Sequence, residues 1–391
     1  MSVSESASDT TTIPIVDIDS HFTEPADLWQ SRAPARFQEG APRLIDDPEN
    51  EGGQCWVAGD VRLSPPGLCV IRPDRSKELG VFTLSHMDEM TPAATEVGAR
   101  LSAMDELGIA MQVVFPNVLG FAGATILRIE DPDLRLFCTT AYNDAASDLQ
   151  KASGGRLFCQ AIIPFWDVDA AARELERAHD ELGLTGFNMI DNASHWGLPS
   201  IHEKHWDPLW ARAEERGMPC NFHIGAGGVD IGAVWPGINP KHYLATLSCT
   251  FFLNNCRTIS NLIFSGLLDR FPRQKFVSVE SGVGWIPFML QAIEYQMDES
   301  IPDGGDMKLR PTEYFRRQFY ASFWFENDAA RAVRELGEDN VLFETDFPHP
   351  TCLYPNVREH VTRSLEGLSE EAQRKVLYEN ATRVYQLPSP A

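Results

Sequence analysis

The sequence of 391 residues contains no apolar run of the roughly 20 residues that a membrane helix needs. Its opening segment, MSVSESASDTTT, has neither a basic stretch nor an apolar one, so we expect no export signal and a cytoplasmic protein. The eight cysteines form no CxxC pair, which predicts reduced thiols rather than a disulfide framework. Positive charge is scarce: 33 Lys and Arg stand against 56 Asp and Glu, a net charge of −23. This acidity argues against nucleic acid or an anionic membrane as a partner.

Glycine-rich phosphate loops are missing as well, because neither G-x-G-x-x-G nor G-x-x-x-x-G-K-[ST] follows an apolar run. Eight short apolar runs are present instead, and helix-favouring stretches separate them. The runs lie at 15–18, 111–115, 158–163, 186–190, 218–222, 276–279, 319–322 and 341–343. The expected helices lie at 99–107, 134–153, 168–182, 208–216, 252–270, 286–298, 328–336 and 369–378. Alternation of buried strands with amphipathic helices predicts an α/β fold, and eight such units favour a (β/α)8 TIM-type barrel.

The predicted organisation is a disordered tail at 1–12 followed by a single barrel at 13–391. Residues 25–98 are far too many for an ordinary strand-to-helix connection, and they include short strand-like stretches and a turn-rich segment. We expect them to form a long β-containing insertion after the first strand, lying over the active-site face. A second long connection, 225–248, is rich in glycine and aromatic residues and is expected to border the same face.

Polar side chains stand where four of the predicted strands end. Asp19 and His21 end the first run, His223 the fifth, Glu280 the sixth and Asp346 the eighth. Barrel enzymes place their sites at this end of the strands, so two imidazoles and three carboxylates are expected to converge. Carboxylates this close repel one another unless a cation holds them, and imidazole with carboxylate is a ligand set for Zn, Mn or Fe(II). The sequence therefore predicts a metal site.

These motifs resemble the amidohydrolase superfamily, in particular the amidohydrolase-related branch that includes aminocarboxymuconate semialdehyde decarboxylase and the resorcylate-type decarboxylases. The resemblance rests on Asp19-Ser20-His21, His223 and Thr345-Asp346-Phe347-Pro348-His349, with support from Trp206-Asp207-Pro208-Leu209-Trp210, Arg270-Phe271-Pro272 and Glu379-Asn380-Ala381. It covers most of the chain outside 25–98.

The resemblance implies one divalent metal, zinc or manganese, held by Asp19, His21, His223 and Asp346, with Asp346 also taking part in proton transfer. The chain departs from the branch at two positions. Asp19 stands where relatives carry His or Glu, which keeps a ligand but shortens its reach. Glu280 stands where the decarboxylases carry a histidine, and a carboxyl group donates a proton near neutral pH only if burial raises its pKa.

Three further polar residues enter the prediction. Glu24 follows the first motif, and with Glu280 it extends the candidate ligands to a set that suits a dinuclear iron or manganese centre. His195, after the fourth strand, is a candidate for orienting the substrate or assisting proton transfer. His349 is a candidate partner of Asp346.

The leading hypothesis is a metal-dependent decarboxylase or hydrolase of a small, carboxylated, cyclic or unsaturated substrate. Asp346, Glu280 and His195 are its catalytic candidates. The alternatives are a dinuclear non-heme iron oxygenase on the same barrel, favoured by Glu24 and Glu280, and a catalytically silent barrel that binds a ligand. A homodimer is a further expectation from the resemblance.

Overall fold

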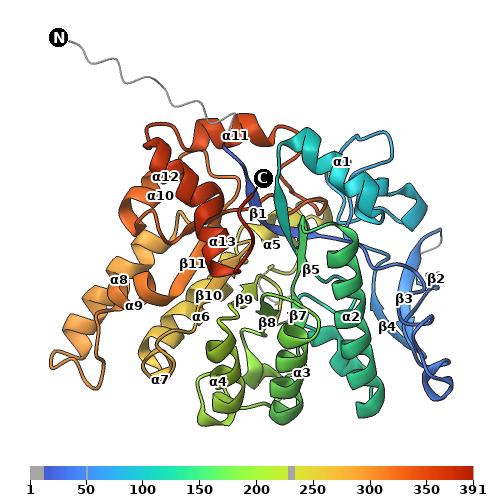
Figure 1. Ribbon diagram of the computed structural model, residues 1–391, viewed down its shortest axis with the longest axis horizontal. Coiled ribbons are helices and arrows are strands. Elements are labelled where there is room, and N and C mark those ends of the chain that lie inside the picture. Colours follow the sequence, from blue (N-terminus) through green and yellow to red (C-terminus); the bar gives the residue numbers. More distant parts are fainter. Residues whose placement is uncertain (1–12, 50–51, 228–233, 391) are drawn as a thin grey trace.

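The computed structural model describes residues 13–49, 52–227 and 234–390; the predicted tail at 1–12 lies outside them. Parallel strands form the centre and helices surround them (Figure 1). The strands are β1 (Val16–His21), β5 (Met111–Phe115), β6 (Leu157–Cys159), β7 (Ala161–Ile162), β8 (Phe187–Asn188), β9 (Cys220–His223), β10 (Phe276–Val279), β11 (Phe319–Phe323) and β12 (Val341–Phe343). They pair in the order β6-β5-β1-β12-β11-β10-β9-β8-β7.

The two ends of this order, β6 and β7, are consecutive pieces of one chain segment and meet at Gln160. The Gln160 amide donates to Val114 O on β5 (2.9 Å), and the next amide, of Ala161, donates to Gly186 O beside β8 (2.9 Å). The single predicted strand at 158–163 thus changes partner at Gln160 and closes the ring. All eight predicted strands are present, and the predicted barrel is confirmed.

The helices are α1 (Val97–Leu107), α2 (Pro132–Ala152), α3 (Val168–Asp180), α4 (Asp207–Arg216), α5 (Tyr243–Ser248), α6 (Phe252–Phe264), α7 (Leu267–Arg270), α8 (Ile286–Ser300), α9 (Pro311–Gln318), α10 (Ala329–Leu336), α11 (Val357–Ser364), α12 (Glu370–Arg374) and α13 (Asn380–Val384). The helix expected at 252–270 is two helices, because Gly266 adopts a φ of +75° between α6 and α7. The sequence analysis missed α5, α9, α11 and α13. Helix α9 begins with a proline, and its first turn is capped by Glu313 Oε2, which accepts a hydrogen bond from Arg310 N (2.8 Å). None of the described helices is both long enough and apolar enough to cross a bilayer.

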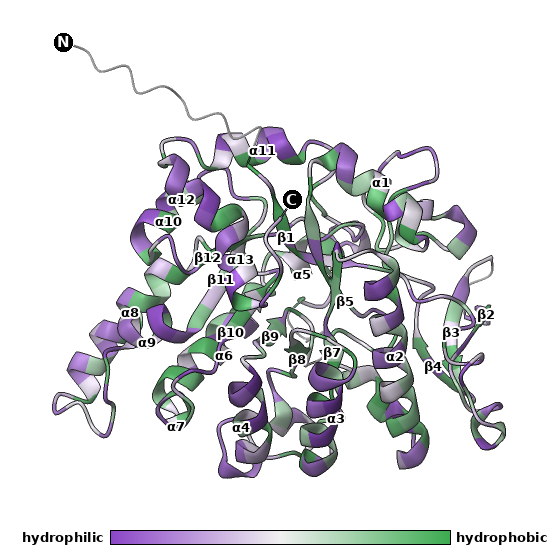
Figure 2. Cartoon of the chain, viewed as in Figure 1, coloured by the Kyte–Doolittle hydropathy of each residue, from purple (hydrophilic) through white to green (hydrophobic). Residues whose placement is uncertain are grey.

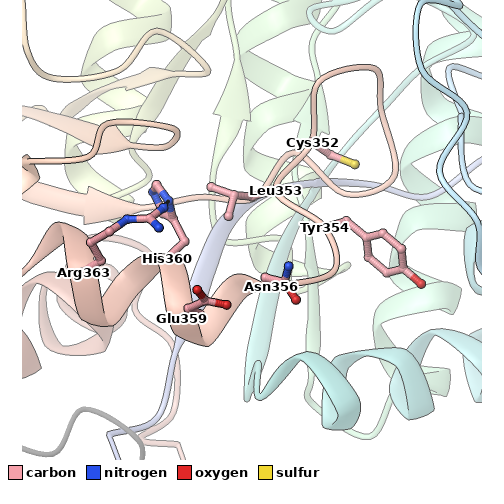
Figure 3. Close-up of a pocket in the computed structure, with 7 residues that line it drawn as sticks. All are labelled: Cys352, Leu353, Tyr354, Asn356, Glu359, His360 and Arg363. Carbon is pink, nitrogen blue, oxygen red and sulfur yellow. Dashed lines mark hydrogen bonds between the residues drawn. The ribbon is translucent and has the colours of Figure 1, made fainter.

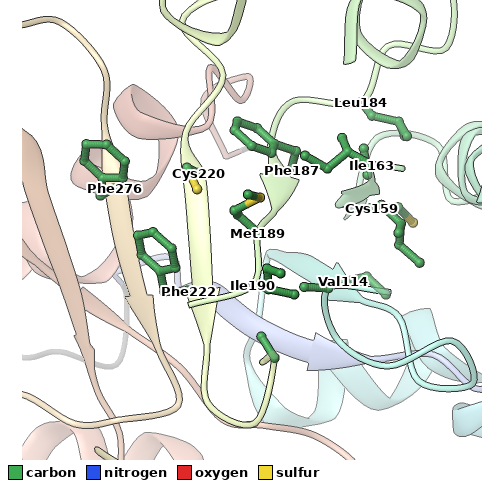
Figure 4. Close-up of a cluster of buried hydrophobic side chains, with 14 of the residues drawn as sticks. Val114, Cys159, Ile163, Leu184, Phe187, Met189, Ile190, Cys220, Phe222 and Phe276 are labelled. Carbon is green, nitrogen blue, oxygen red and sulfur yellow. The ribbon is translucent and has the colours of Figure 1, made fainter. Parts of the chain in front are cut away.

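Two apolar clusters build the core. One lies between the strands and the helices, and Figure 4 shows part of it, including Val114, Cys159, Phe187, Phe222 and Phe276. The other joins side chains of β1, β5, β6, β10, β11 and β12 to α13 and the residues after it. Hydrophobic residues accordingly gather on the strands, whereas hydrophilic ones mark the helices, most clearly α3 and α4 (Figure 2). Through the second cluster, α13 and the residues after it pack against the strands of the barrel.

The long connection between β1 and α1 contains a three-stranded antiparallel sheet, β2 (Arg43–Asp46), β3 (Gln54–Ala58) and β4 (Val61–Ser64). This sheet lies beside α2 at the flank of the barrel (Figure 1). Later residues of the connection reach the loop after β12, because Val70 N donates to Pro348 O (3.1 Å). That the segment 25–98 is an insertion over the active-site face stays a prediction.

Candidate metal centre

Four strands bring their last residues to one buried place. Asp19 and His21 come from β1, His223 from β9, Glu280 from the residue after β10, and Asp346 from the loop after β12. Four of them are almost fully buried, and Glu280 is largely buried, with 13% of its side chain exposed. The sequence-based expectation that these five side chains lie together agrees with the geometry.

The ligand atoms lie within a few ångströms of one another. His21 Nε2 is 3.4 Å from Asp19 Oδ1 and 3.4 Å from Asp346 Oδ1. His223 Nε2 is 3.5 Å from Asp19 Oδ1 and 3.3 Å from His21 Nε2. The other ring nitrogen, His223 Nδ1, lies 2.8 Å from Ile224 O. A carbonyl oxygen accepts, so this contact favours the tautomer with the proton on Nδ1, in which Nε2 faces the cluster with a free lone pair.

Several buried polar atoms of this cluster have no hydrogen-bond partner. They are both carboxylate oxygens of Asp19, both of Asp346, and His21 Nδ1. An unpaired buried carboxylate is costly, and a divalent cation bound by carboxylate and imidazole removes that cost. The donor set of two imidazoles with two or three carboxylates fits Zn²⁺ or Mn²⁺. The residues present therefore fit a divalent metal.

The backbone turns sharply at two of the candidate ligands. Glu280 and Asp346 adopt φ values of +55° and +58°, a region that residues other than glycine seldom occupy. Hydrogen bonds hold both turns: Glu280 N donates to Glu344 Oε2 (3.0 Å), and Asp346 N donates to Asp19 O (2.9 Å). Such strain persists only where neighbours impose it and is often found at functional sites.

His349 is a sixth residue of the cluster, grouped with His21 and Asp346. Its ring stacks on that of His21, with centroids 3.4 Å apart and planes inclined by 15°. Its Nδ1 lies 3.0 Å from Asp346 Oδ1, and its Nε2 lies 2.8 Å from Asn117 Oδ1. His349 is thus placed between Asp346 and Asn117, in keeping with the expectation that it accompanies Asp346.

Sequence reasoning missed two other neighbours of the cluster. Phe121, in the loop after β5, packs its ring 4.1 Å from that of His223 and 5.1 Å from that of His21. Glu344 accepts hydrogen bonds from Glu280 N and from the Ser322 hydroxyl. Glu344 stands directly after β12, and this strand-end position was the available signal; Phe121 carried no comparable signal.

The charges of the cluster are arranged unevenly. Burial opposes ionisation of Asp19, but His223 and His21 offset it and hold the Asp19 pKa at about 2. Burial lowers the pKa of His21 to about 4 and raises that of Glu280 to about 8. Burial, with Glu280 and Asp19 nearby, raises the pKa of Asp346 well above its usual range. Burial and the neighbouring charges thus favour the ionised form of Asp19 and the protonated forms of Glu280 and Asp346.

Two predicted site residues lie elsewhere. Glu24 Oε1 accepts from the backbone amides of Asn117 (2.8 Å) and Val118 (3.1 Å), and Glu24 belongs to none of the ligand groups formed by the described residues. His195 is exposed in the short helix Ala193–Trp196, beside the ring of Trp196. Without Glu24 in the cluster, the structure does not favour the dinuclear alternative.

The surface hollow shown in Figure 3 is separate from the metal cluster. It has a volume of about 270 Å³ and is lined by residues of the loop after β12 and of α11, among them Asn356, Glu359 and Arg363. None of the six residues of the cluster lines it.

The chain is similar in sequence and in structure to several known proteins. Gamma-resorcylate decarboxylase of Rhizobium radiobacter is 24% identical over 296 residues, which cover 74% of this chain and 86% of that one. A crystal structure of an amidohydrolase from Mycobacterium avium subsp. paratuberculosis K-10 has a TM-score of 0.73 at 22% identity, covering 96% and 99% of the two chains. A dihydroxybenzoic acid decarboxylase from Polaromonas sp. JS666, solved with manganese and 2-nitroresorcinol, has a TM-score of 0.60 at 19% identity, covering 96% and 97%.

The amidohydrolase family model matches residues 16–387, which include β1, β9, β10 and β12 and the whole metal cluster. With the barrel and the strand-end ligands, this match shows that the chain belongs to the amidohydrolase family.

Proposed function

We propose that this chain is a metal-dependent decarboxylase of a carboxylated, hydroxylated aromatic ring. The observation that carries the proposal is Asp346, a buried carboxyl group with no hydrogen-bond partner and an upward-shifted pKa, beside His21 and His349. The gamma-resorcylate decarboxylases among the relatives support decarboxylation over hydrolysis.

The metal ligands in this proposal are Asp19, His21, His223 and Asp346. A divalent metal bound by these residues would supply positive charge for binding the carboxylate of the substrate. Manganese in the Polaromonas enzyme supports the choice of metal. The ring of Phe121 beside both histidines supplies an apolar aromatic surface against which a substrate ring can pack.

Loss of carbon dioxide breaks the bond between the ring carbon and the carboxyl carbon and leaves the electron pair on the ring carbon. A proton must then reach that carbon. Asp346 is the donor in this proposal: its carboxylate would take up the proton of the substrate hydroxyl group and pass it to the ring carbon, and burial with the neighbouring carboxyl groups favours that uptake. Glu280, with a pKa of about 8, holds a proton at neutral pH and is the second candidate donor. His195 is too exposed to share this environment, and we assign it no role in proton transfer.

The substitution Asp346→Asn tests this assignment, because an amide oxygen can still bind the metal but the amide supplies no acidic proton. With 2,6-dihydroxybenzoate and related hydroxybenzoates as substrates, we expect turnover to fall by roughly 10²- to 10⁴-fold while the metal content stays unchanged. Turnover near that of the parent protein would contradict the role of Asp346.

A further inference from the structure

A second cavity lies outside the barrel, between the outer face of β5 and β6, helix α2 and the chain that leaves β1. Its volume is about 340 Å³, within the range of pockets that hold small organic ligands. None of the six metal-cluster residues, all of them described, is among its lining residues. Most of its wall is apolar, formed by Leu28, Val97, Val114, Ala145, Ala146 and Leu149.

Glu24 is the buried acidic group in this wall. It is 3% exposed, and its Oε1 is occupied by the amides of Asn117 and Val118. Its second oxygen, Oε2, is buried and has no hydrogen-bond partner. A buried carboxyl oxygen left without a donor costs free energy, and a ligand that brings a donor removes this cost.

The opposite end of the cavity reaches the surface. Four exposed residues line this end: Asp27, Ser31, Arg32 and Asp148. Arg32 forms an ion pair with Asp148 (2.9 Å), and the side chain of Asp148 is 64% exposed. All four residues are exposed, so this end of the cavity is where a small molecule would enter.

We propose that this cavity is a second ligand site and that it binds a phenol, a small neutral molecule with one aromatic ring. The hydroxyl group of the phenol donates a hydrogen bond to Glu24. Tyr142 and Leu149 of α2 and Val114 of β5 are among the lining residues that would contact the ring. The site is independent of the proposed reaction, so either proposal can fail without the other.

The chemistry of the wall selects this class. Apolar side chains favour a neutral ring, and a ring with a donor satisfies Glu24 Oε2. A benzoate would have to bring a full negative charge into an apolar wall beside a buried carboxyl group, where burial already opposes charge and raises the pKa of Glu24. A benzylammonium would have to give up the hydration of a full charge within an apolar wall, which costs far more than burying a hydroxyl group.

The direct test is a crystal of the full chain soaked with 4-bromophenol, because the anomalous signal of bromine shows where the ligand binds. We expect a bromine peak in the cavity and the hydroxyl within hydrogen-bond distance of Glu24. Bromine peaks only at the metal cluster or on the surface would overturn the proposal.

Titration calorimetry with phenol, toluene, benzoate and benzylammonium tests the class in solution. We expect phenol to bind most tightly. Ala146→Leu fills the cavity, and Glu24→Gln keeps an oxygen for the two backbone amides but replaces the free acceptor by a donor. We expect Ala146→Leu to abolish phenol binding at the cavity and Glu24→Gln to weaken it about tenfold, the value of one hydrogen bond. Lys151→Leu, on the exposed surface of α2, is the control and should bind phenol like the parent protein.

Melting temperatures show whether each variant is folded. If Ala146→Leu does not fold, Glu24→Gln alone decides the role of the carboxyl group. Unchanged phenol affinity in a folded Glu24→Gln protein, or tighter binding of benzylammonium than of phenol, would overturn the proposal.

Discussion

Asp17 and Thr345 join the first strand of the barrel to the loop after the last one, next to two candidate metal ligands. Asp17 Oδ1 accepts from Thr345 N (2.8 Å) and Asp17 Oδ2 from the Thr345 hydroxyl (2.5 Å). Asp19 lies two residues after Asp17, and Asp346 follows Thr345. The pair therefore fixes the distance between two candidate metal ligands that come from opposite ends of the sequence.

Removing the Thr345 hydroxyl should destabilise the protein. In Thr345→Val the buried Asp17 Oδ2 loses one donor and keeps only Gln112 Nε2, at 2.9 Å. We expect the free energy of unfolding to fall by about 1–3 kcal/mol, measured by denaturant titration. Thr140→Val, which removes a hydroxyl bonded within α2, is the matched control and should change stability by less than about 0.5 kcal/mol. Equal effects of the two substitutions would contradict this account.

Arg100 is a fully buried cation that supports the same region. Its guanidinium donates to Ala93 O (2.6 Å) and Gln112 Oε1 (3.1 Å) and also to His21 O. Arg100→Met leaves these acceptors without a donor, and we expect a loss of about 3 kcal/mol or more in unfolding free energy. The exposed Arg173→Met should be nearly neutral. A thermal melt of Arg100→Met that matches that of Arg173→Met would rule out the structural role of Arg100.

Metal content should depend on the residues of the cluster and not on the two predicted residues outside it. Elemental analysis should find about one zinc or manganese ion per chain in the parent protein. His223→Ala should lose most of the bound metal. Removing a residue that only hydrogen-bonds to a metal ligand typically lowers metal affinity roughly 10- to 100-fold, and removing a ligand itself should lower it by more. His195→Ala and Glu24→Gln should keep the metal. About two irons per chain, lost in Glu24→Gln, would restore the dinuclear alternative.

Metal affinity should rise with pH. In the metal-free protein the pKa of Asp346 is raised well above its usual range and that of Glu280 is raised to about 8, so both carboxyl groups favour their protonated forms as the pH falls. A bound metal favours the deprotonated Asp346 and therefore displaces a proton, so affinity increases from pH 6 to 8. His21 does not oppose this trend, because its pKa of about 4 leaves it neutral throughout. Calorimetric titration of the metal in two buffers of different ionisation enthalpy measures how many protons are released on binding. A metal affinity that does not change with pH would contradict the assignment of Asp346 as a ligand.

The sequence predicted the barrel because its strands are short apolar runs with regular spacing. Asp19, His21, His223, Glu280 and Asp346 could be placed together because each lies at or close to the C-terminal end of a strand, and parallel strands of a barrel end at one face. Glu24 was misleading for the same reason: it follows β1 closely, but the chain turns away there, and its side chain caps the amides of Asn117 and Val118.

Other features depend on contacts between distant segments, which spacing along the chain does not reveal. The stacking of His349 on His21 and the packing of Phe121 against His223 both require loops whose course the sequence alone did not predict. The division of α6 from α7 depended on the backbone angle at a single glycine, Gly266. The placement of 25–98 over the active-site face and the homodimer stay predictions.

The release of labelled carbon dioxide tests the central claim most directly. Protein loaded with manganese is incubated with hydroxybenzoates labelled with ¹³C in the carboxyl group, beginning with 2,6-dihydroxybenzoate, and the gas is measured by mass spectrometry. We expect labelled carbon dioxide from the loaded protein with at least one of these acids, and its loss after removal of the metal. Folded, metal-loaded protein that releases none from any of them, or the same amount without metal, would contradict the proposed decarboxylase.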